Sequence, residues 1–463
     1  MNNLTHVIAA VSTPPGKGGV AIIRMSGEGA FEIAERVFFP LSGRRFSECR
    51  PRVQIYGHII HEGEKIDDVL CARFPAPHSY TGEDTVEIGC HGGILVTSLV
   101  LEALLNAGAV PAVAGEFTRR AFINGRLSLT EAEAISDLLE AKSREQLRLS
   151  GGEARGRLSA RIAEIRRSLI GLMSSVYARI DYPDEDLGDF TDGELLSHLI
   201  NIKEDCVALK NSYRTGRAIS EGIKTVICGK PNAGKSSLYN LLLGEDAAIV
   251  TDIPGTTRDV LKSSIPLGRV MLNLADTAGI RESEGMDAVE RIGVTKSLDL
   301  MAKSELLFAV FDISRPLDGE DELIISAAKN TSVPKIALLN KADLDCLIDE
   351  NSFRDFDAVI KISAKERGDE AISSLADTVN RLFTDEKLVI GQDAILSSAR
   401  QHAAITRCID FLSAAIESLN IGFPQDAVSG DIERALGAIS ELDGRAVSEE
   451  IVADIFSKFC VGK

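Results

Sequence analysis

The sequence predicts a multidomain fold with three parts: an N-terminal α+β domain, a discontinuous α-helical domain, and an α/β domain inserted between the two helical segments. A chain of 463 residues is too long for one hydrophobic core, and a typical domain size of ~100–200 residues suggests about three domains. Short β-like runs dominate the first part, and long amphipathic patterns flank a segment that runs from a strand through a glycine-rich turn into a helix. We therefore place the domain segments at 1–124, 125–221, 222–384 and 385–463.

The composition is that of an ordinary globular protein, with 44% hydrophobic and 26% charged residues. No apolar run approaches the ~20 residues that a membrane-spanning helix requires, so we expect no membrane association. The first residues lack the cationic segment of a secretory signal, and their short apolar stretch ends at Pro14 and Pro15. The eight cysteines are scattered without the spacing of a zinc site. These features predict a cytoplasmic protein with reduced thiols.

The net charge limits the kind of nucleic-acid binding that is expected. A formal charge of −18 argues against non-specific binding, which requires a basic surface. Residues 119–167 nevertheless contain eleven Lys or Arg against seven Asp or Glu. This segment is either the solvated face of a helix or a surface for RNA or a partner, and both interpretations stay open.

The N-terminal part mixes strands and helices. Residues 20–25, 53–60 and 85–90 are rich in β-branched and other apolar residues and are predicted to be strands. Residues 94–108 have helical spacing and end at a glycine suited to a helix C-cap. The segment therefore predicts one α+β domain.

Long amphipathic helices are predicted on both sides of the inserted domain. Apolar residues recur at i, i+3, i+4 and i+7 in 129–150 and 157–180, and an acidic turn at 181–190 follows. The same texture returns in 394–419 and 431–444. Two chain segments are thus expected to build one helical domain.

A phosphate-binding loop is predicted at the start of the inserted domain. Residues 224–244 read as a strand, a glycine-rich turn and a helix, and they contain GxxxxGKS from Gly229 to Ser236. Backbone N–H groups of such a loop converge on phosphate oxygens, and the helix N-terminus adds positive potential. We expect Lys235 to reach the β- and γ-phosphates and the Ser236 hydroxyl to bind Mg²⁺.

Two further elements follow in the order found in nucleotide switches. The segment TDIPGTTRD (251–259) offers Thr257 as a second Mg²⁺ ligand. The segment NLADTAG (273–279) ends an apolar strand with Asp276 close to the metal and Gly279, whose N–H can meet the γ-phosphate. Contacts of this kind order loops in a nucleotide-dependent way.

The last two elements specify the base. KIALLNKAD (335–343) supplies Asp343, whose carboxylate can accept hydrogen bonds from the N1–H and 2-amino groups of guanine. Adenine lacks this donor pair and would leave a buried Asp unpaired, so the sequence predicts GTP rather than ATP in a Ras-like P-loop G domain. KISAK (361–365) adds a backbone contact to the base. The expected GTP contacts are Asn232, Ala233, Gly234, Lys235, Ser236, Ser237, Thr251, Asp252, Ile253, Pro254, Gly255, Thr256, Thr257, Asp276, Thr277, Ala278, Gly279, Asn340, Lys341, Asp343, Ser363, Ala364 and Lys365.

The hydrolytic apparatus differs from that of small Ras-like switches. These place Gln directly after DTAG to orient water, but Ile280 stands there and cannot hydrogen-bond. Asn232 resembles the Asn of GTPases that use K⁺ beside the phosphates, unless it only shapes the loop. Glu290 carries a carboxylate able to position water as the catalytic group, unless it is a solvated helix residue. The expected K⁺ ligands are Asn232, Thr251, Ile253 and Thr256.

Several longer motifs make a family resemblance specific. Together with the flanking domains, they resemble the tRNA-modifying GTPase MnmE (TrmE) family over essentially the whole chain. The matching stretches are GTTRD (255–259), DTAGIRE (276–282), VERIG (289–293), residues 13–27, 79–93 and 114–141, and the final FCVGK.

The resemblance implies a tetrahydrofolate-binding N-terminal domain that also dimerises, a discontinuous helical domain and an inserted G domain. It implies K⁺-stimulated GTP hydrolysis through dimerisation of G domains. It further implies a homodimer that forms a heterotetramer with an FAD- and NADH-dependent partner, MnmG. The pair would modify carbon 5 of the wobble uridine (U34) of certain tRNAs to a (carboxymethyl)aminomethyl-type group, using a folate one-carbon unit from 5-formyltetrahydrofolate or a related compound.

The resemblance also assigns residues to the folate site. Arg24, Glu87, Arg126 and Lys463 match the folate contacts of the family, and Cys460 matches the tail cysteine placed near the folate. The chemistry agrees, because a Glu can pair with the pterin amide and cations can clamp the glutamate carboxylates. Arg24 and Glu87 could instead be surface residues of edge strands.

A second class of function stays open. The chain could be a regulatory or ribosome-assembly GTPase whose flanking domains only bind RNA or protein. The two hypotheses differ in what they predict for the N-terminal domain, because only the tRNA-modifying enzyme needs to bind folate there. A purely structural scaffold would require an inactive G domain.

Overall fold

The chain forms two compact units, each described by itself. The computed structural model describes residues 6–181, 191–243, 263–274, 301, 303–363 and 369–463. The first unit contains Met1–Leu139, Glu153–Ile202 and Arg407–Lys463, and the second contains Glu140–Gly152 and Lys203–Thr406. In these described ranges no helix is long and apolar enough to cross a bilayer.

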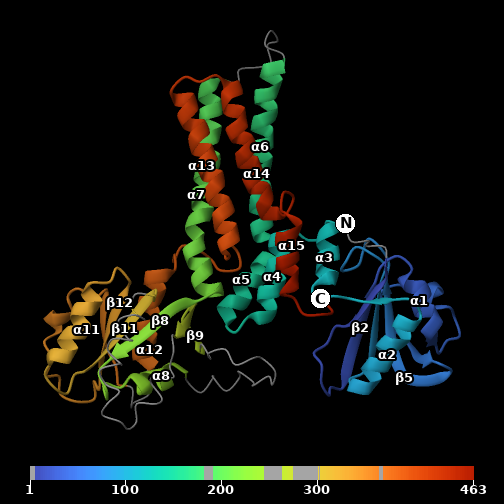
Figure 1. The fold of residues 1–463 in the computed structure, drawn as a ribbon, viewed down its shortest axis with the longest axis horizontal. Coiled ribbons are helices and arrows are strands. Elements are labelled where there is room, and N and C mark those ends of the chain that lie inside the picture. Colours follow the sequence, from blue (N-terminus) through green and yellow to red (C-terminus); the bar gives the residue numbers. More distant parts are fainter. Residues whose placement is uncertain (1–5, 182–190, 244–262, 275–300, 302, 364–368) are drawn as a thin grey trace. The chain divides into compact units, whose positions relative to one another are not determined.

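A seven-stranded sheet is the centre of the N-terminal part (Figure 1). Its strand order is β3-β4-β5-β6-β2-β1-β7, with antiparallel pairing throughout except for the parallel pair of β1 and β7. The strands are β1 (Ile8–Val11), β2 (Val20–Ser26), β3 (Phe38–Pro40), β4 (Ile55–His61), β5 (Glu64–Phe74), β6 (Thr85–His91) and β7 (Val110–Pro111). The helices of this part are α1 (Ala30–Val37), α2 (Ile94–Asn106) and α3 (Glu116–Ile123). The three predicted strands correspond to β2, β4 and β6, and the predicted helix corresponds to α2.

The two faces of this sheet differ in what covers them. Alternating residues such as Ile23 and Ile88 are fully buried in a core to which α1 and α2 contribute. On the opposite face Val20, Tyr56 and Leu70 remain 68%, 50% and 43% exposed. The alternation therefore buries one face and leaves an apolar surface on the other.

The helical segments flank the inserted domain in the sequence, as predicted. The helices are α4 (Leu129–Glu140), α5 (Arg144–Ala154), α6 (Arg157–Asp181), α7 (Asp192–Ser220), α13 (Ala399–Asn420), α14 (Gln425–Asp443) and α15 (Glu449–Ser457). Within the first unit α6 packs along α14 (Figure 1). The pattern at 129–150 is two helices rather than one. Ser143 begins the second helix as an N-cap, since its hydroxyl accepts from the N–H of Gln146 and the Gln146 side chain accepts from the N–H of Lys142.

A six-stranded sheet forms the centre of the second unit. Its order is β13-β12-β11-β8-β10-β9, and all neighbours are parallel except β9 and β10. The strands are β8 (Ile223–Gly229), β9 (Ser263–Leu267), β10 (Val270–Leu274), β11 (Leu306–Asp312), β12 (Lys335–Asn340) and β13 (Ala358–Lys361). Helices α8 (Lys235–Leu243) and α12 (Asp369–Phe383) contribute to the core on one face, and α11 (Gly319–Lys329) contributes to the core on the other. The predicted multidomain class, with an α/β domain between helical segments, is confirmed.

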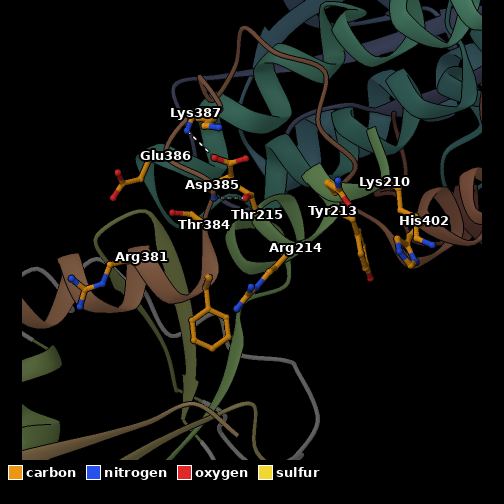
Figure 2. Close-up of a pocket in the computed structure, with 12 residues that line it drawn as sticks. Lys210, Tyr213, Arg214, Thr215, Arg381, Thr384, Asp385, Glu386, Lys387 and His402 are labelled. Carbon is orange, nitrogen blue, oxygen red and sulfur yellow. Dashed lines mark hydrogen bonds between the residues drawn. The ribbon is translucent and has the colours of Figure 1, made fainter. Parts of the chain in front are cut away.

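The segment that follows α12 crosses the end of α7 (Figure 2). The N–H of Asp385 donates to the hydroxyl of Thr215 at 2.8 Å, and Arg214 donates to the carbonyl of Leu382. Nearby, the rings of Tyr213 and His402 stack with their centroids 4.3 Å apart. A hollow of about 790 Å³ opens among these side chains, and among the described residues no member of a nucleotide motif lines it. The nucleotide motifs that the structure describes follow β8, β12 and β13 at one edge of the second sheet.

Candidate functional site

The loop between β8 and α8 has the geometry of a phosphate-binding loop. Two of its glycines have positive φ angles, 154° at Gly229 and 99° at Gly234. A Cβ on Gly229 would lie 2.5 Å from the carbonyl oxygen of Val310, and one on Gly234 would lie 1.8 Å from Nδ2 of Asn340. Both positions therefore require glycine, because any side chain would collide with the neighbouring strand or loop.

Lys235 and the two serines that follow it lie at the first turn of α8. The ammonium of Lys235 donates to the carbonyls of Gly229 and Lys230 at 2.8 and 2.7 Å, so it points back over the loop. Burial lowers the pKa of Lys235. Ser236 and Ser237 are exposed where the helix N-terminus presents its backbone N–H groups. This arrangement can bind an anion and offer a hydroxyl to its metal ion.

The motifs predicted to read the base lie beside this loop. Asn340 ends β12, is buried, and donates from Nδ2 to the carbonyl of Ala233 at 2.8 Å. The hydroxyl of Ser363 donates to Oδ1 of Asp343 at 2.8 Å. The sheet order places β8, β11, β12 and β13 side by side, so their carboxyl ends gather the loops at one edge. Motifs separated by more than a hundred residues thus form one site.

Two of the predicted residues, Asp343 and Asn232, are exposed. Asp343 is exposed on the loop that follows β12. Asn232 is exposed and has a φ of 61°, a left-handed conformation that Asn tolerates better than most residues. The remaining predicted residues lie outside the described residues: Thr251, Asp252, Ile253, Pro254, Gly255, Thr256, Thr257, Asp276, Thr277, Ala278, Gly279, Glu290, Ala364 and Lys365.

A carboxylate that the sequence analysis missed lies in the same site. Asp312, the last residue of β11, accepts from the ammonium of Lys341 at 2.5 Å and from the hydroxyl of Ser314 at 2.6 Å. Burial opposes the ionisation of Asp312, but the hydrogen bonds from Lys341 and Ser314 outweigh it and hold the pKa below its ordinary value. The signal was present in the sequence, because Asp312 ends an apolar strand at the same sheet edge as the motifs.

A second polar site lies on the N-terminal sheet. Arg24 in β2 and Glu87 in β6 are opposite each other in the antiparallel register. The Nε and one terminal nitrogen of Arg24 each lie 2.9 Å from Oε1 of Glu87. The guanidinium also lies over the rings of Tyr80 and Phe117, 5.1 and 5.7 Å from their centroids. The pair is therefore fixed by neighbours and is not a loose surface pair.

The C-terminal tail meets this sheet. Val461 forms an antiparallel bridge with Ala114, and the Ser12 hydroxyl donates to the carbonyl of Gly462 at 3.0 Å. Burial lowers the pKa of Lys463, and the positive charge of Arg24 lowers it further. Cys460 is exposed on the same tail. The two ends of the sequence thus build one site.

Arg126 borders the same region. Its side chain packs near Gly82, because a Cβ on that glycine would lie 3.2 Å from Cγ of Arg126. Beside it, Asn124 donates to the carbonyl of Thr81 at 2.8 Å, which holds the loop that carries Tyr80.

Glu87 also lines a hollow of about 470 Å³ on the exposed sheet face, among Val20, Ile22, Tyr56, Leu70 and His91. The candidate nucleotide site therefore lies at the edge of one sheet, and the site around Glu87 lies at a hollow on the face of the other.

The glycine-rich loop before α8, together with the NKxD loop that touches it, defines a P-loop guanine-nucleotide-binding protein, a GTPase. Residues 7–126 match the family described as GTP-binding protein TrmE N-terminus, and residues 129–460 match the MnmE helical domain. The chain is 39% identical over 463 residues to the tRNA modification GTPase MnmE of Acetivibrio thermocellus, covering 98% of this chain and 99% of that protein. It is 41% identical over 460 residues to that of Thermotoga petrophila, with the same coverages, and 38% identical over 463 residues to that of Clostridioides difficile, covering 99% and 100%. The chain belongs to the MnmE family of tRNA modification GTPases.

Proposed function

We propose that this GTPase acts in the cytoplasm on tRNA. It works with an FAD- and NADH-dependent partner of the MnmG type in a heterotetramer. The complex adds a (carboxymethyl)aminomethyl-type group to carbon 5 of the wobble uridine (U34) of certain tRNAs. The carbon comes from a folate one-carbon unit bound by residues 1–124 together with the C-terminal tail. The names of the relatives, which are tRNA modification GTPases, support the substrate class.

One observation carries the folate part of this proposal: the C-terminal tail, which ends in Lys463, joins the sheet that carries the Arg24–Glu87 pair. A carboxylate and a cation on the sheet, together with a cation on the tail, can bind an anionic ligand and also pair with an amide. Both contacts of Arg24 are to Oε1 of Glu87, so Oε2 can accept from the amide and amino donors of a pterin. The cations of Lys463 and Arg126 can clamp the glutamate carboxylates.

Binding of 5-formyltetrahydrofolate to the full chain, measured by calorimetry, tests this site. We expect saturable binding, and we expect Glu87→Gln to weaken it about 10-fold or more, because hydrogen bonds to charged groups contribute ~1.5–3 kcal/mol. Glu64→Gln is the matched control, since Glu64 is an exposed carboxylate at the start of the neighbouring strand β5. Absence of folate binding would favour a regulatory or ribosome-assembly GTPase.

The GTP cycle of the proposal uses residues from both sides of the phosphate loop. Ser236, exposed at the first turn of α8, and Thr257 would hold Mg²⁺, which neutralises charge on the phosphates when bound. Asn232 would contribute its amide oxygen to K⁺, together with Thr251, Ile253 and Thr256, and Glu290 would position the attacking water. The exposure and left-handed φ of Asn232 support a side chain that extends over the loop rather than packing beneath it.

Turnover in KCl and NaCl at equal ionic strength tests the potassium part. We expect faster GTP hydrolysis in K⁺, and we expect Asn232→Ala to remove the difference while GTP still binds. Equal rates in the two salts would contradict the assignment of Asn232. Glu290→Ala is expected to spare GTP binding and slow hydrolysis, and normal turnover of that variant would assign the water to another residue.

The exposed sheet face supports a homodimer as the working form. Val20, Ile22, Tyr56 and Leu70 expose apolar surface on neighbouring strands, and a second copy of the same sheet is a partner of matching chemistry. We expect Leu70→Glu to shift the full chain toward the monomer in analytical ultracentrifugation. Leu95→Glu, at an exposed leucine of α2, the helix that covers the opposite face of the sheet, should leave the dimer intact.

A further inference from the structure

Lys230, the residue after the first glycine of the phosphate loop, is a buried ammonium paired with one buried carboxylate, Asp321, and one exposed carboxylate, Asp318. Its side chain is only 6% exposed, and its ammonium donates to Oδ2 of Asp321 at 3.1 Å and to Oδ2 of Asp318. The Asp321 side chain is 4% exposed. An ammonium in such a place is stable only because two carboxylates compensate for its lost hydration.

The two carboxylates are themselves fixed by the start of α11. Oδ1 of Asp318 accepts from the N–H groups of Glu320 and Asp321 at 3.0 and 3.4 Å, and Oδ2 of Asp321 accepts from the N–H of Asp318 at 3.2 Å. This reciprocal pattern is a capping box. The helix cap therefore anchors the side chain of Lys230 on a rigid element.

Charged contacts continue from this cluster to the base-binding loop. Arg315 lies 3.5 Å from Oδ2 of Asp318 and 3.6 Å from Oδ2 of Asp312. Asp312 accepts from Lys341 of the NKAD motif at 2.5 Å. Alternating charges thus join the loop that receives the phosphates to the loop that receives guanine.

The backbone of Lys230 is part of the phosphate loop itself. Its carbonyl oxygen accepts from the N–H of Ala233 at 3.2 Å and from the ammonium of Lys235 at 2.7 Å. The preceding Gly229 has no side chain and contacts the neighbouring strand closely. Lys230 is therefore the first residue after β8 whose side chain attaches the loop to another element, the start of α11.

We propose that Lys230 is a positioning residue of the GTPase, which holds the phosphate loop against the capped start of α11 and links it to Lys341. Lys230 does not touch the nucleotide in this role, because its ammonium is directed to Asp318 and Asp321. Its loss loosens the turn whose N–H groups bind the phosphates. Loss of Lys230 therefore changes the affinity for nucleotide and the rate of its release more than it changes the rate of hydrolysis.

Nucleotide release from the full-length chain tests the proposal, measured by stopped flow with a fluorescent GDP. We expect Lys230→Met and Asp321→Asn each to speed release about 10- to 100-fold and raise KM, with kcat within about twofold, as expected for lost charge-assisted hydrogen bonds. The double variant should be no faster than the faster single one, because both remove the same contact. Lys230→Arg should restore release to within about threefold of the parent chain, because it keeps the charge.

Two further variants separate positioning from stability. Asp318→Asn removes one charge near Lys230 but keeps a good N-cap residue, so it should fold normally and still speed release. Lys329→Met is the matched control, since Lys329 pairs with Asp355 at 2.8 Å on the surface, where the side chains are 45% and 48% exposed. Unchanged release in Lys230→Met and Asp318→Asn, with only a lower melting temperature, would overturn the proposal. So would equal effects of the Lys329 control.

Discussion

The side-chain amide of Asn340 donates to the backbone carbonyl of Ala233 at 2.8 Å. This hydrogen bond joins the NKxD loop to the glycine-rich loop. The contact is buried and spans more than a hundred residues of sequence. Gly234 follows immediately and has no room for a side chain beside the same amide. We therefore expect recognition of guanine and binding of phosphate to depend on one another in this domain.

Gly234→Ala is expected to abolish most GTP binding. Its Cβ would lie 1.8 Å from Nδ2 of Asn340, and the φ of 99° is unfavourable for alanine, which costs ~1–3 kcal/mol by itself. Gly319→Ala is the matched control, because a Cβ there would meet no atom of the described residues within 4 Å and its φ is not positive. Isothermal calorimetry with GTP checks both, and equal affinities in the two variants would contradict the tight approach of Gly234 to Asn340.

Asp343→Asn is expected to weaken GTP roughly 100-fold, because two hydrogen bonds from guanine to a carboxylate are replaced by weaker and partly mismatched ones. The same variant should bind xanthosine triphosphate better than the parent chain does, since xanthine offers an acceptor where guanine offers its amino group. Asp345→Asn, two residues further along the same exposed loop, should change neither affinity. Competition binding with GTP and xanthosine triphosphate measures both affinities, and an unchanged preference for GTP in Asp343→Asn would contradict the prediction.

Gly462→Ala is expected to detach the C-terminal tail from the N-terminal sheet. The φ of Gly462 is 96°, and a Cβ there would lie 2.4 Å from the carbonyl oxygen of Val11. Faster hydrogen exchange at Val461 and weaker folate binding should follow. Gly63→Ala has a similar positive φ of 84°, but its Cβ would meet no atom within 4 Å in the described part of the chain, so it tests the effect of backbone strain alone. Equal behaviour of the two variants would argue against a tail that is fixed in the proposed folate site.

Thiol titration at pH 8 is expected to find two fast-reacting cysteines in the native chain, Cys346 and Cys460, which are exposed. The other six are buried. Burial raises the pKa of Cys90 to about 11 and that of Cys228 to about 12, which keeps these thiols protonated and slow. All eight should react after denaturation. Fast reaction of Cys228 in the native chain would mean that the nucleotide sheet opens readily.

Local patterns in the sequence were sufficient for the fold class and for most helices. Strands β2, β4 and β6 were predictable because their apolar residues are concentrated in short runs. Strand β5 was not predicted, because its first half carries Glu64, Lys65, Asp67 and Asp68, and only cross-strand pairing identifies it. The break between α4 and α5 depended on a single capping serine, Ser143, inside an otherwise continuous helical pattern.

Residues of the candidate site could be predicted where they belong to a motif with fixed spacing. Residues whose role depends on tertiary contacts were missed. GKPNAGKS and NKAD identified the nucleotide loops directly. Lys230 and Asp312 were overlooked, because their importance comes from partners on other elements, Asp321 and Lys341, that no local pattern places beside them.

In the proposed function, the GTPase and the proposed folate site both serve modification of the tRNA wobble uridine. Nucleoside mass spectrometry of tRNA from cells lacking this chain tests the claim most directly, with complementation by the parent chain, Glu87→Gln or Asp343→Asn. We predict that the C5-aminomethyl-type uridines disappear, return with the parent chain, and fail to return with either variant. Unchanged wobble nucleosides in the cells that lack the chain would contradict the claim.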